Sequence, residues 1–290
     1  MKFPFQNVAL IGKHRAPEIA GPLLSLAAFL SSRGLSVVVD SLTAEQIKDS
    51  PYPAMSLNEM ASVMDLAIVI GGDGTMLNIA RTLSPHQVPL VGVNQGRLGF
   101  LTDLTLENMQ DSMEAMLDGK FVTEQRLLLS ARVLRNNIEI SSGLAFNEVV
   151  VHRSNISSMI EFEVRIDGEY LYNQRADGLI VSSPTGSTAY ALSAGGPILH
   201  PSLDVLELVP VCPHTLSNRP IVVKSSSVLE ILMHRTSDIH VRYDSHTSCG
   251  LQLHDKIVVT RHPEAACLLH PVGHSYYHTL REKLLWNQTL

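Results

Sequence analysis

A short glycine-rich stretch between a buried strand and a helix constrains this chain more than any other feature. Residues 66–70 are an uncharged apolar run, which predicts a buried parallel strand, and residues 76–81 have the apolar spacing of a helix. Between them lies Gly71-Gly72-Asp73-Gly74-Thr75. The pattern therefore predicts the carboxylate of Asp73 just beyond the carboxyl end of a strand, where open α/β sheets bind their ligands.

The residue types of this turn suit a phosphate-containing ligand. Glycines permit backbone angles that are closed to other residues, and they let a ligand approach the main chain closely. Free N–H groups at the start of the helix, with Thr75 as a candidate cap, make a seat for phosphate. The predicted phosphate-binding residues are Gly71, Gly72, Gly74 and Thr75. A tight turn without a ligand is the alternative for this motif taken alone.

Strands and helices alternate over residues 1–120. Strands are predicted at 8–12, 36–40, 66–70 and 89–94, and helices at 17–33, 57–64 and 106–117. This alternation predicts an α/β domain, a parallel sheet with helices on both faces. Residues 121–274 differ, because short β-branched runs flank turn pairs such as Asn136-Asn137 and Asp167-Gly168. They predict a β-rich, sandwich-like domain, and the helical tail 275–290 is expected to pack back on the first domain.

Composition excludes several classes of function. The 290 residues have a formal net charge of -6 and no Lys/Arg run, which argues against a nucleic-acid partner. The three cysteines form no CxxC pair, so we expect reduced thiols and a cytoplasmic protein. The uncharged segment 178–203 is interrupted by Pro, Gly, Ser and Thr, and the N-terminus lacks a signal-like pattern. We therefore expect neither a membrane span nor a signal sequence.

Two further polar stretches adjoin predicted strands. Asp177 and the strand 179–182 lead into residues 183–190, which are dense in small hydroxyls and suit a neutral polar ligand or a phosphate chain. Asn147-Glu148 lies at the entrance of the strand 149–152, where both side chains can bind sugar hydroxyls or a base edge. A serine-rich surface loop and a polar turn are the respective alternatives.

Together these stretches resemble the motifs of the bacterial NAD kinases, which phosphorylate the adenosine 2′-hydroxyl of NAD to give NADP. The resemblance runs through residues 71–75, 94–101, 147–148, 177–190 and 194–201, and it extends to His270-Pro271. It covers essentially the whole chain. It implies an N-terminal α/β domain and a C-terminal β-rich domain with the dinucleotide between them, which agrees with the division predicted above.

The resemblance also implies the roles of individual residues. Asp73 would be the general base that accepts the 2′-hydroxyl proton as the γ-phosphoryl group of ATP, or a polyphosphate, is transferred. A divalent ion, Mg²⁺, would neutralise charge, although no metal-binding residue is predicted. The chain has no GxxxxGK[ST], so the phosphate seat is not a Walker P-loop. The residues implied in NAD binding are Asp73, Gly74, Phe100 (near the adenine), Asn147, Glu148, Ser158, Arg175, Asp177, Thr188, Ala189, Tyr190, Ser193, Asp244 and His246.

His246 departs from the family pattern. Many members have an Asp-Gly-Gln-like stretch here that contacts NAD across the subunit boundary, whereas this chain has Asp244-Ser245-His246. An imidazole titrates near neutrality, which predicts a pH dependence of NAD binding. Because the family's dinucleotide pocket is shared between subunits, the resemblance implies a homo-oligomer, a dimer or a tetramer.

Four alternatives stay open at the level of sequence. A lipid or sugar kinase could share the Gly-Gly-Asp turn, and a catalytically silent NAD- or NADP-sensing module could share the fold. His274 and His278 are spaced i, i+4 on the tail helix, but without an acidic partner they indicate packing or surface histidines more than a metal site. Lys13-His14-Arg15 follows the first strand and fits either ATP phosphates or a solvated loop.

Overall fold

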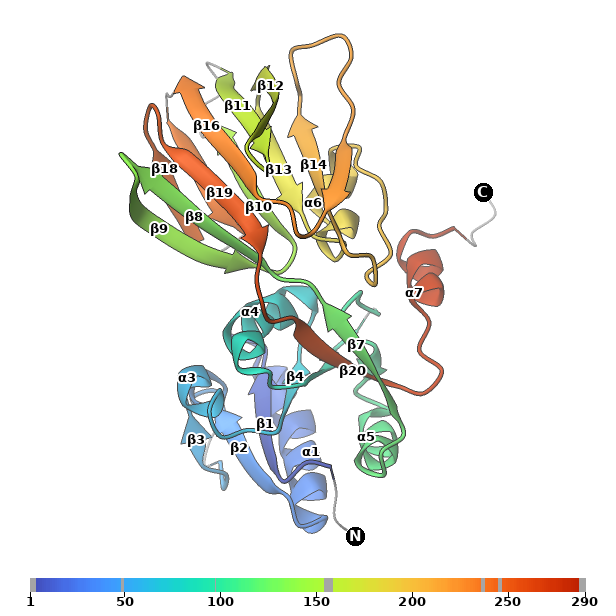
Figure 1. Cartoon of the computed structure of the whole chain (residues 1–290). Coiled ribbons are helices and arrows are strands. Elements are labelled where there is room, and N and C mark those ends of the chain that lie inside the picture. Colours follow the sequence, from blue (N-terminus) through green and yellow to red (C-terminus); the bar gives the residue numbers. More distant parts are fainter. Residues whose placement is uncertain are drawn as a thin grey trace. The chain divides into compact units, whose positions relative to one another are not determined.

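A computed structural model describes residues 4–47, 50–96, 98–153, 159–235, 238–244 and 247–286. The chain divides into two compact units (Figure 1). The first unit contains residues 1–125 and 266–290, and the second contains residues 126–265. The sequence predicts these divisions at 120/121 and 274/275. They lie elsewhere because the strands at both crossings, β7 (Phe121–Arg126) and β20 (Ala266–Pro271), pair into the sheet of the first unit.

The first unit is built on an eight-stranded sheet in the order β3-β2-β1-β4-β5-β20-β7, with β6 also paired to β5. All pairs among β1 to β6, and the pair of β5 with β20, are parallel. Parallel strands need cover on both faces, and the central strand β4 is buried along its whole length. The remaining strands of this sheet are β1 (Asn7–Gly12), β2 (Ser36–Asp40), β3 (Ala54–Met55), β4 (Leu66–Ile70), β5 (Leu90–Asn94) and β6 (Leu104–Thr105).

Helices cover both faces of this sheet, as the alternation of strands and helices predicts. The apolar faces of α1 (Ala20–Ser32) and α5 (Met109–Leu117) join one core cluster with alternate strand residues such as Leu10 and Ile68. The buried residues of α4 (Asp73–Leu83) lie outside this cluster. No helix among the described residues has the length and apolar character that crossing a membrane requires. The other helices of this unit are α2 (Ser41–Ala44), α3 (Leu57–Met60) and α7 (Tyr276–Lys283), and the 3-10 turns are η1 (Pro17–Ile19) and η2 (Ser84–His86).

The second unit is a sandwich of two six-stranded antiparallel sheets, which confirms the β-rich fold class. The sheets have the orders β15-β14-β13-β10-β17-β18 and β12-β11-β16-β19-β8-β9. Alternate residues of both sheets, among them Val149 and Phe162, form one apolar core. The strands are β8 (Leu129–Arg135), β9 (Ile138–Ala145), β10 (Glu148–Arg153), β11 (Ile160–Ile166), β12 (Glu169–Ala176), β13 (Gly178–Ser182), β14 (Val205–Val211), β15 (Ile221–Lys224), β16 (Leu229–Arg235), β17 (Ile239–Tyr243), β18 (Thr247–Leu251) and β19 (Lys256–Arg261).

Both predicted hairpins are present in this unit. Asn136 and Asn137 connect β8 to β9 with φ of 51° and 63°, and Asp167 and Gly168 connect β11 to β12 with φ of 53° and 81°. Two positive φ values are what a two-residue turn needs to match the right-handed twist of its strands. The outward face of the β10–β13–β14 sheet is covered by the short helix α6 (Tyr190–Ser193), which follows the turn η3 (Gly186–Thr188).

Candidate functional site

Asp73 begins helix α4 directly after strand β4, where the sequence predicts it. Its carboxylate accepts two backbone hydrogen bonds, at 2.9 Å from the Phe100 N–H and at 3.0 Å from the Leu101 N–H, one on each oxygen. The Thr102 hydroxyl lies 3.4 Å from Oδ1. A carboxylate held by backbone donors has a fixed direction. Oδ2, which accepts from the Phe100 N–H, keeps a further lone pair that can accept a proton from a ligand.

The loop that holds Asp73 depends on a close approach at Gly99. A Cβ at this position would lie 2.2 Å from Asp73 Oδ1 and 2.3 Å from Thr102 Oγ1, so only glycine fits without movement. The amide of Asn94 donates to Thr102 Oγ1 at 3.0 Å, and its oxygen accepts from the Gly96 N–H at 2.7 Å. Asn94, at the end of β5, therefore supports the residues that hold the Asp73 carboxylate.

The predicted phosphate seat differs from expectation in two details. Thr75 is not the N-cap of α4, because the helix begins at Asp73 and its N-cap is Gly72. Gly72 has an extended backbone with φ of -105°, and it has no side chain that could cap the helix. Gly71, Gly72 and Gly74 are not among the glycines with positive φ, so unusual backbone angles do not explain them. A Cβ at Gly71 would lie 2.7 Å from Thr75 Oγ1, whereas one at Gly72 or Gly74 would meet nothing within 4 Å. The surface above Gly72 and Gly74 is therefore open to a ligand, whereas the Thr75 N–H donates to the Gly72 carbonyl at 3.0 Å.

Phe100 contacts the tail of its own unit. Its ring centroid lies 6.5 Å from that of Tyr276 in α7, and Lys283 Nζ lies 6.0 Å from it. The tail therefore packs beside the loop that holds Asp73. The adenine contact implied for Phe100 stays a prediction, and this ring is half-buried.

A second group of predicted residues meets on the outward face of the β10–β13 sheet. A cavity of about 440 Å³ is lined by Glu148, Asp177, Tyr190 and Asp244, each of which the sequence resemblance implies in NAD binding. The side chain of Glu148 is buried, and its Oε2 has no hydrogen-bond partner among the described residues. Asp177 pairs with Arg153 at 2.9 Å. A ligand that donates a hydrogen bond to this buried oxygen would satisfy it.

Burial sets the electrostatics of Glu148. Loss of solvent, followed by the nearby charges of Asp244 and Glu207, raises the pKa of Glu148 to about 8. Burial also raises the pKa of Glu207 to about 7. Glu148 is therefore largely protonated at neutral pH and can donate a hydrogen bond as well as accept one.

Asp244 organises the backbone around this cavity. Its carboxylate accepts hydrogen bonds from the N–H groups of Phe146 (3.0 Å), Asn147 (2.9 Å) and Glu148 (3.2 Å). It has φ of 51°, which places it in a left-handed turn after β17. Within the described chain, the structural role of Asp244 is to fix the entrance of β10, and its predicted contact with NAD stays a prediction.

The hydroxyl-rich segment after β13 is folded against the same backbone. Ser183 donates from its N–H to the Asn147 carbonyl at 2.8 Å and from its hydroxyl to the Phe146 carbonyl at 2.6 Å. A Cβ at Gly186 would lie 2.3 Å from the Asn147 carbonyl oxygen. Most hydroxyls of this segment are buried and bonded to backbone, so they build the loop. The remaining predicted contacts Thr188, Ala189 and Ser193 lie at its more accessible end, next to Tyr190.

Several predicted residues lie elsewhere or cannot be placed. Arg175, two residues before Asp177, lies on β12 of the other sheet, where it pairs with Glu161 at 2.9 Å and lines a separate cavity of about 450 Å³. Ser158 and His246 lie outside the described residues. The structure therefore brings Glu148, Asp177, Tyr190 and Asp244 together but does not bring Arg175 to them.

Three cationic or titratable residues of the 440 Å³ cavity were not predicted from the sequence. His152, Arg153 and Arg242 line it beside the acidic residues. The signal was available for His152, because Glu148, Val150 and His152 alternate along β10 and so share one face. Burial lowers the pKa of His152, which keeps this imidazole neutral beside Arg242. A cavity with two guanidinium groups suits a ligand with phosphates.

Comparisons with known proteins assign both units to one family. Residues 8–121 match the model described as "ATP-NAD kinase N-terminal domain", and residues 146–270 match "ATP-NAD kinase C-terminal domain". The chain is 58% identical to the NAD kinase of Nitrosomonas europaea over 99% of this chain and 97% of that one. It is also 58% identical to the NAD kinase of Nitrosospira multiformis over 99% of this chain and 98% of that one.

Two solved structures show a similar fold. Yeast NADH kinase complexed with NADH has a TM-score of 0.90 and 25% identity, covering 99% of this chain and 89% of that chain. An NAD kinase from Archaeoglobus fulgidus in complex with ATP has a TM-score of 0.73 and 25% identity, covering 97% of this chain and 98% of that chain.

Proposed function

The chain belongs to the NAD kinase family of phosphotransferases, and we propose that it transfers the γ-phosphoryl group of ATP to the adenosine 2′-hydroxyl of NAD. The complexes of its structural relatives, one with NADH and one with ATP, support this pair of substrates. Inorganic polyphosphate is the second donor to test. The lipid or sugar kinase alternative has no support among these relatives.

Asp73 is the general base in this proposal, and its geometry is the observation that supports the proposal best. The N–H groups of Phe100 and Leu101 hold its carboxylate in one direction at the end of β4. The attacking hydroxyl must lose its proton during phosphoryl transfer, and a fixed carboxylate within hydrogen-bond reach can accept it. Most of the rate then comes from positioning and from neutralised charge.

The open first turn of α4 is the proposed phosphate seat. Gly72 and Gly74 leave the backbone accessible, and the positive end of the α4 dipole favours an anion. Mg²⁺ keeps several waters and is held mainly by substrate phosphates with one or two carboxylates. Both oxygens of Asp73 already accept backbone hydrogen bonds, so we assign Mg²⁺ to the phosphates of the donor, where it would neutralise charge. Asp73 then serves only to accept the proton of the attacking hydroxyl.

The acidic and basic residues of the second unit are the proposed NAD contacts. Glu148, with an unsatisfied buried oxygen, and Asn147 would bind ribose hydroxyls or the base, and Arg153 and Arg242 would meet phosphates. Asp177 and Tyr190 complete the cavity wall. We further propose a homo-oligomer that acts in the cytoplasm. The three free cysteines of the chain support that compartment, and size-exclusion chromatography with light scattering tests the oligomer.

The first experiment is an assay of NADP formation from NAD, ATP and Mg²⁺ with an NADP-specific dehydrogenase as reporter. We expect Asp73→Asn to lower kcat by roughly 10²-fold or more while the Kd for NAD changes little, as for loss of a general base. Asp111→Asn is the matched control, because Asp111 is also an acidic residue in the first turn of a helix of this unit but is exposed.

The alternatives give different results. Unchanged turnover in Asp73→Asn would contradict the role of this carboxylate as base. NAD binding by calorimetry without product from ATP or from polyphosphate would instead favour the sensing module.

A further inference from the structure

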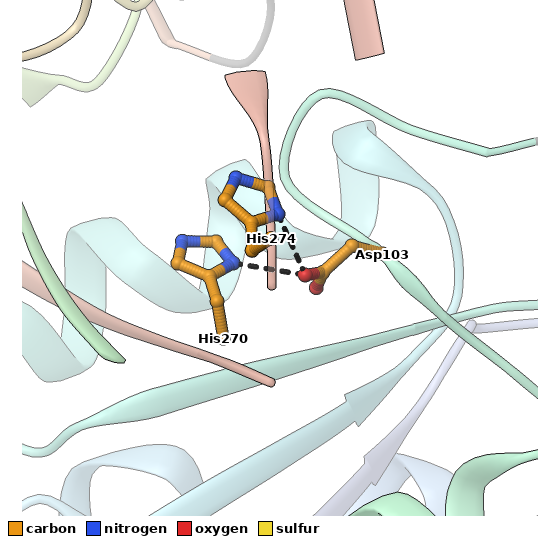
Figure 2. A group of neighbouring side chains, drawn as sticks. All are labelled: Asp103, His270 and His274. Carbon is orange, nitrogen blue, oxygen red and sulfur yellow. Dashed lines mark hydrogen bonds and ion pairs between the residues drawn. The ribbon is translucent and has the colours of Figure 1, made fainter. Parts of the chain in front are cut away.

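Three side chains from two distant parts of the sequence meet in the first unit, beside the start of the C-terminal helix α7 (Figure 2). Asp103 follows the loop that holds Asp73, His270 lies on β20, and His274 lies just before α7. Both Nδ1 atoms point at the same carboxylate oxygen of Asp103, at 3.1 Å from His270 and 3.0 Å from His274. The three side chains are at most 14% exposed. His274 is one of the two histidines that sequence spacing singled out, and Asp103 is the acidic partner that the sequence did not reveal.

We propose that Asp103, His270 and His274 bind a divalent transition-metal ion, with Zn²⁺ as the best-suited class. The three ligand atoms lie within 4.8 Å of one another. Two imidazole nitrogens and a carboxylate oxygen are ligands that Zn²⁺ binds at about 2.0–2.2 Å, usually with a fourth position for water. Nitrogen–oxygen separations of 3.0 and 3.1 Å are close to the edge of such a coordination polyhedron.

Glu124 gives His270 the outer hydrogen-bond partner that metal-binding histidines commonly have. Its Oε2 lies 3.0 Å from Nε2 of His270, on the ring nitrogen opposite the proposed ligand atom. Metal-bound histidines almost always donate the second N–H to a carboxylate or a carbonyl, which fixes the tautomer and the ring direction. Glu124 therefore presents Nδ1 of His270 toward Asp103 and a bound ion.

The orientation of the two rings limits how an ion can bind. The rings of His270 and His274 stack at 4.0 Å with an angle of 14° between their planes. A histidine nitrogen binds a metal in the plane of its ring, so one of two stacked rings must turn before both meet a shared ion. Glu124 holds the ring of His270, whereas Nε2 of His274 has no hydrogen-bond partner among the described residues, so we assign this movement to His274.

An ion here would be separate from the Mg²⁺ proposed on the substrate phosphates. It would connect β20 and the start of α7 to Asp103, which directly follows the residues that bind the Asp73 carboxylate. Mg²⁺ prefers oxygen ligands and octahedral geometry, whereas a site with two imidazoles selects Zn²⁺ or Co²⁺. This difference makes the two sites distinguishable in one sample.

The test uses the full-length protein, stripped with a chelator and dialysed, and Co²⁺ as the spectroscopic probe. We expect one Co²⁺ per chain with the visible absorption of a four- or five-coordinate site, displaced by Zn²⁺ and unaffected by millimolar Mg²⁺. Asp103→Asn and His274→Ala should each weaken Co²⁺ binding more than about tenfold, and Glu124→Gln should weaken it by about 10- to 100-fold. His278→Ala should leave it unchanged, because His278 is exposed one helical turn further along α7.

X-ray absorption on the unmodified protein removes any dependence on the folding of variants. Two imidazole nitrogens and a carboxylate oxygen in the first shell of bound Co²⁺ or Zn²⁺ are expected. A shell of water oxygens alone, or Co²⁺ binding that is the same in Asp103→Asn and His274→Ala as in the unmodified protein, would overturn the proposal. Circular dichroism of each variant checks that a loss of Co²⁺ binding is not caused by a loss of the folded structure.

Discussion

At the scale of residues, the proposed function of Asp73 depends on Gly99. The carboxylate is useful as a base only while the N–H groups of Phe100 and Leu101 direct it, and those groups reach it because Gly99 has no side chain. A neighbouring glycine of the same loop, Gly96, is free of this constraint, since a Cβ there would meet nothing within 4 Å. The two glycines therefore provide a direct comparison.

Gly99→Ala should displace Asp73 or Thr102 and lower kcat by roughly tenfold or more, because a small misplacement of a catalytic group is costly. Gly96→Ala should leave kcat near that of the unmodified enzyme. Steady-state kinetics with NAD and ATP, with thermal unfolding as a check on the fold, measures both. Equal activity of the two variants would show that the contact between Gly99 and Asp73 does not matter for catalysis.

Glu148 should make stability depend on pH. Its folded pKa of about 8 lies above its ordinary value of 4.5, so the folded state binds the proton more tightly than the unfolded state does. Burying the ionised Glu148 carboxylate lowers the free energy of unfolding. This loss of stability is absent below pH 4.5, grows as the pH rises toward 8, and reaches its full size above that pH. Glu148→Gln should therefore match the unmodified protein at low pH and be more stable by about 1 kcal/mol or more at alkaline pH.

Urea unfolding across this pH range measures the effect. The control is Glu169→Gln, which removes the same charge from an exposed position on β12. A gain that is the same for both variants, or one that does not depend on pH, would contradict the burial of a protonated Glu148.

At the scale of elements, turns and caps decide how each strand and helix ends. Gly34 and Gly119 follow α1 and α5 with φ of 83°, as expected for residues that stop a helix in a left-handed conformation. Asn136-Asn137 and Asp167-Gly168 close their hairpins in the same region of φ. These elements were predictable because each turn depends on residues that are adjacent in the sequence.

The hairpin of β11 and β12 gives the test at this scale. Gly168→Ala should lower the free energy of unfolding by about 1 kcal/mol, because an L-residue is strained at φ of 81°. Gly21→Ala should instead stabilise by up to about 1 kcal/mol, since Gly21 lies in α1 with open space around its Cα. Denaturant unfolding of both variants measures these changes in the free energy of unfolding. A stabilising effect of Gly168→Ala would contradict the turn geometry.

At the scale of the whole molecule, the first unit is discontinuous and the second is not. The strand β20 comes from the end of the chain and lies between β5 and β7 in the sheet of the first unit. We expect a fragment of residues 126–265 to fold alone, with cooperative unfolding, and a fragment of residues 1–125 not to do so. The physical reason is that the fragment of residues 1–125 lacks the interior strand β20, so β5 and β7 lose their shared partner.

Circular dichroism and limited proteolysis of the two fragments measure this. Adding a peptide of residues 266–286 to the fragment of residues 1–125 should restore protection from proteolysis. A fragment of residues 1–125 that is as resistant as the intact chain would show that β20 is dispensable for this unit.

The sequence by itself determined the parallel and antiparallel halves, both hairpins, the place of Asp73 at the end of β4, and the family. These follow from periodicity, turn residues and motifs, all of which are local along the chain. Only the tertiary structure decided that Arg175 and Asp177 line different cavities, that Asp244 holds the backbone of residues 146–148, and that Asp103 meets His270 and His274. Those contacts depend on strand order and on which strand ends adjoin, and local periodicity carries no information about either.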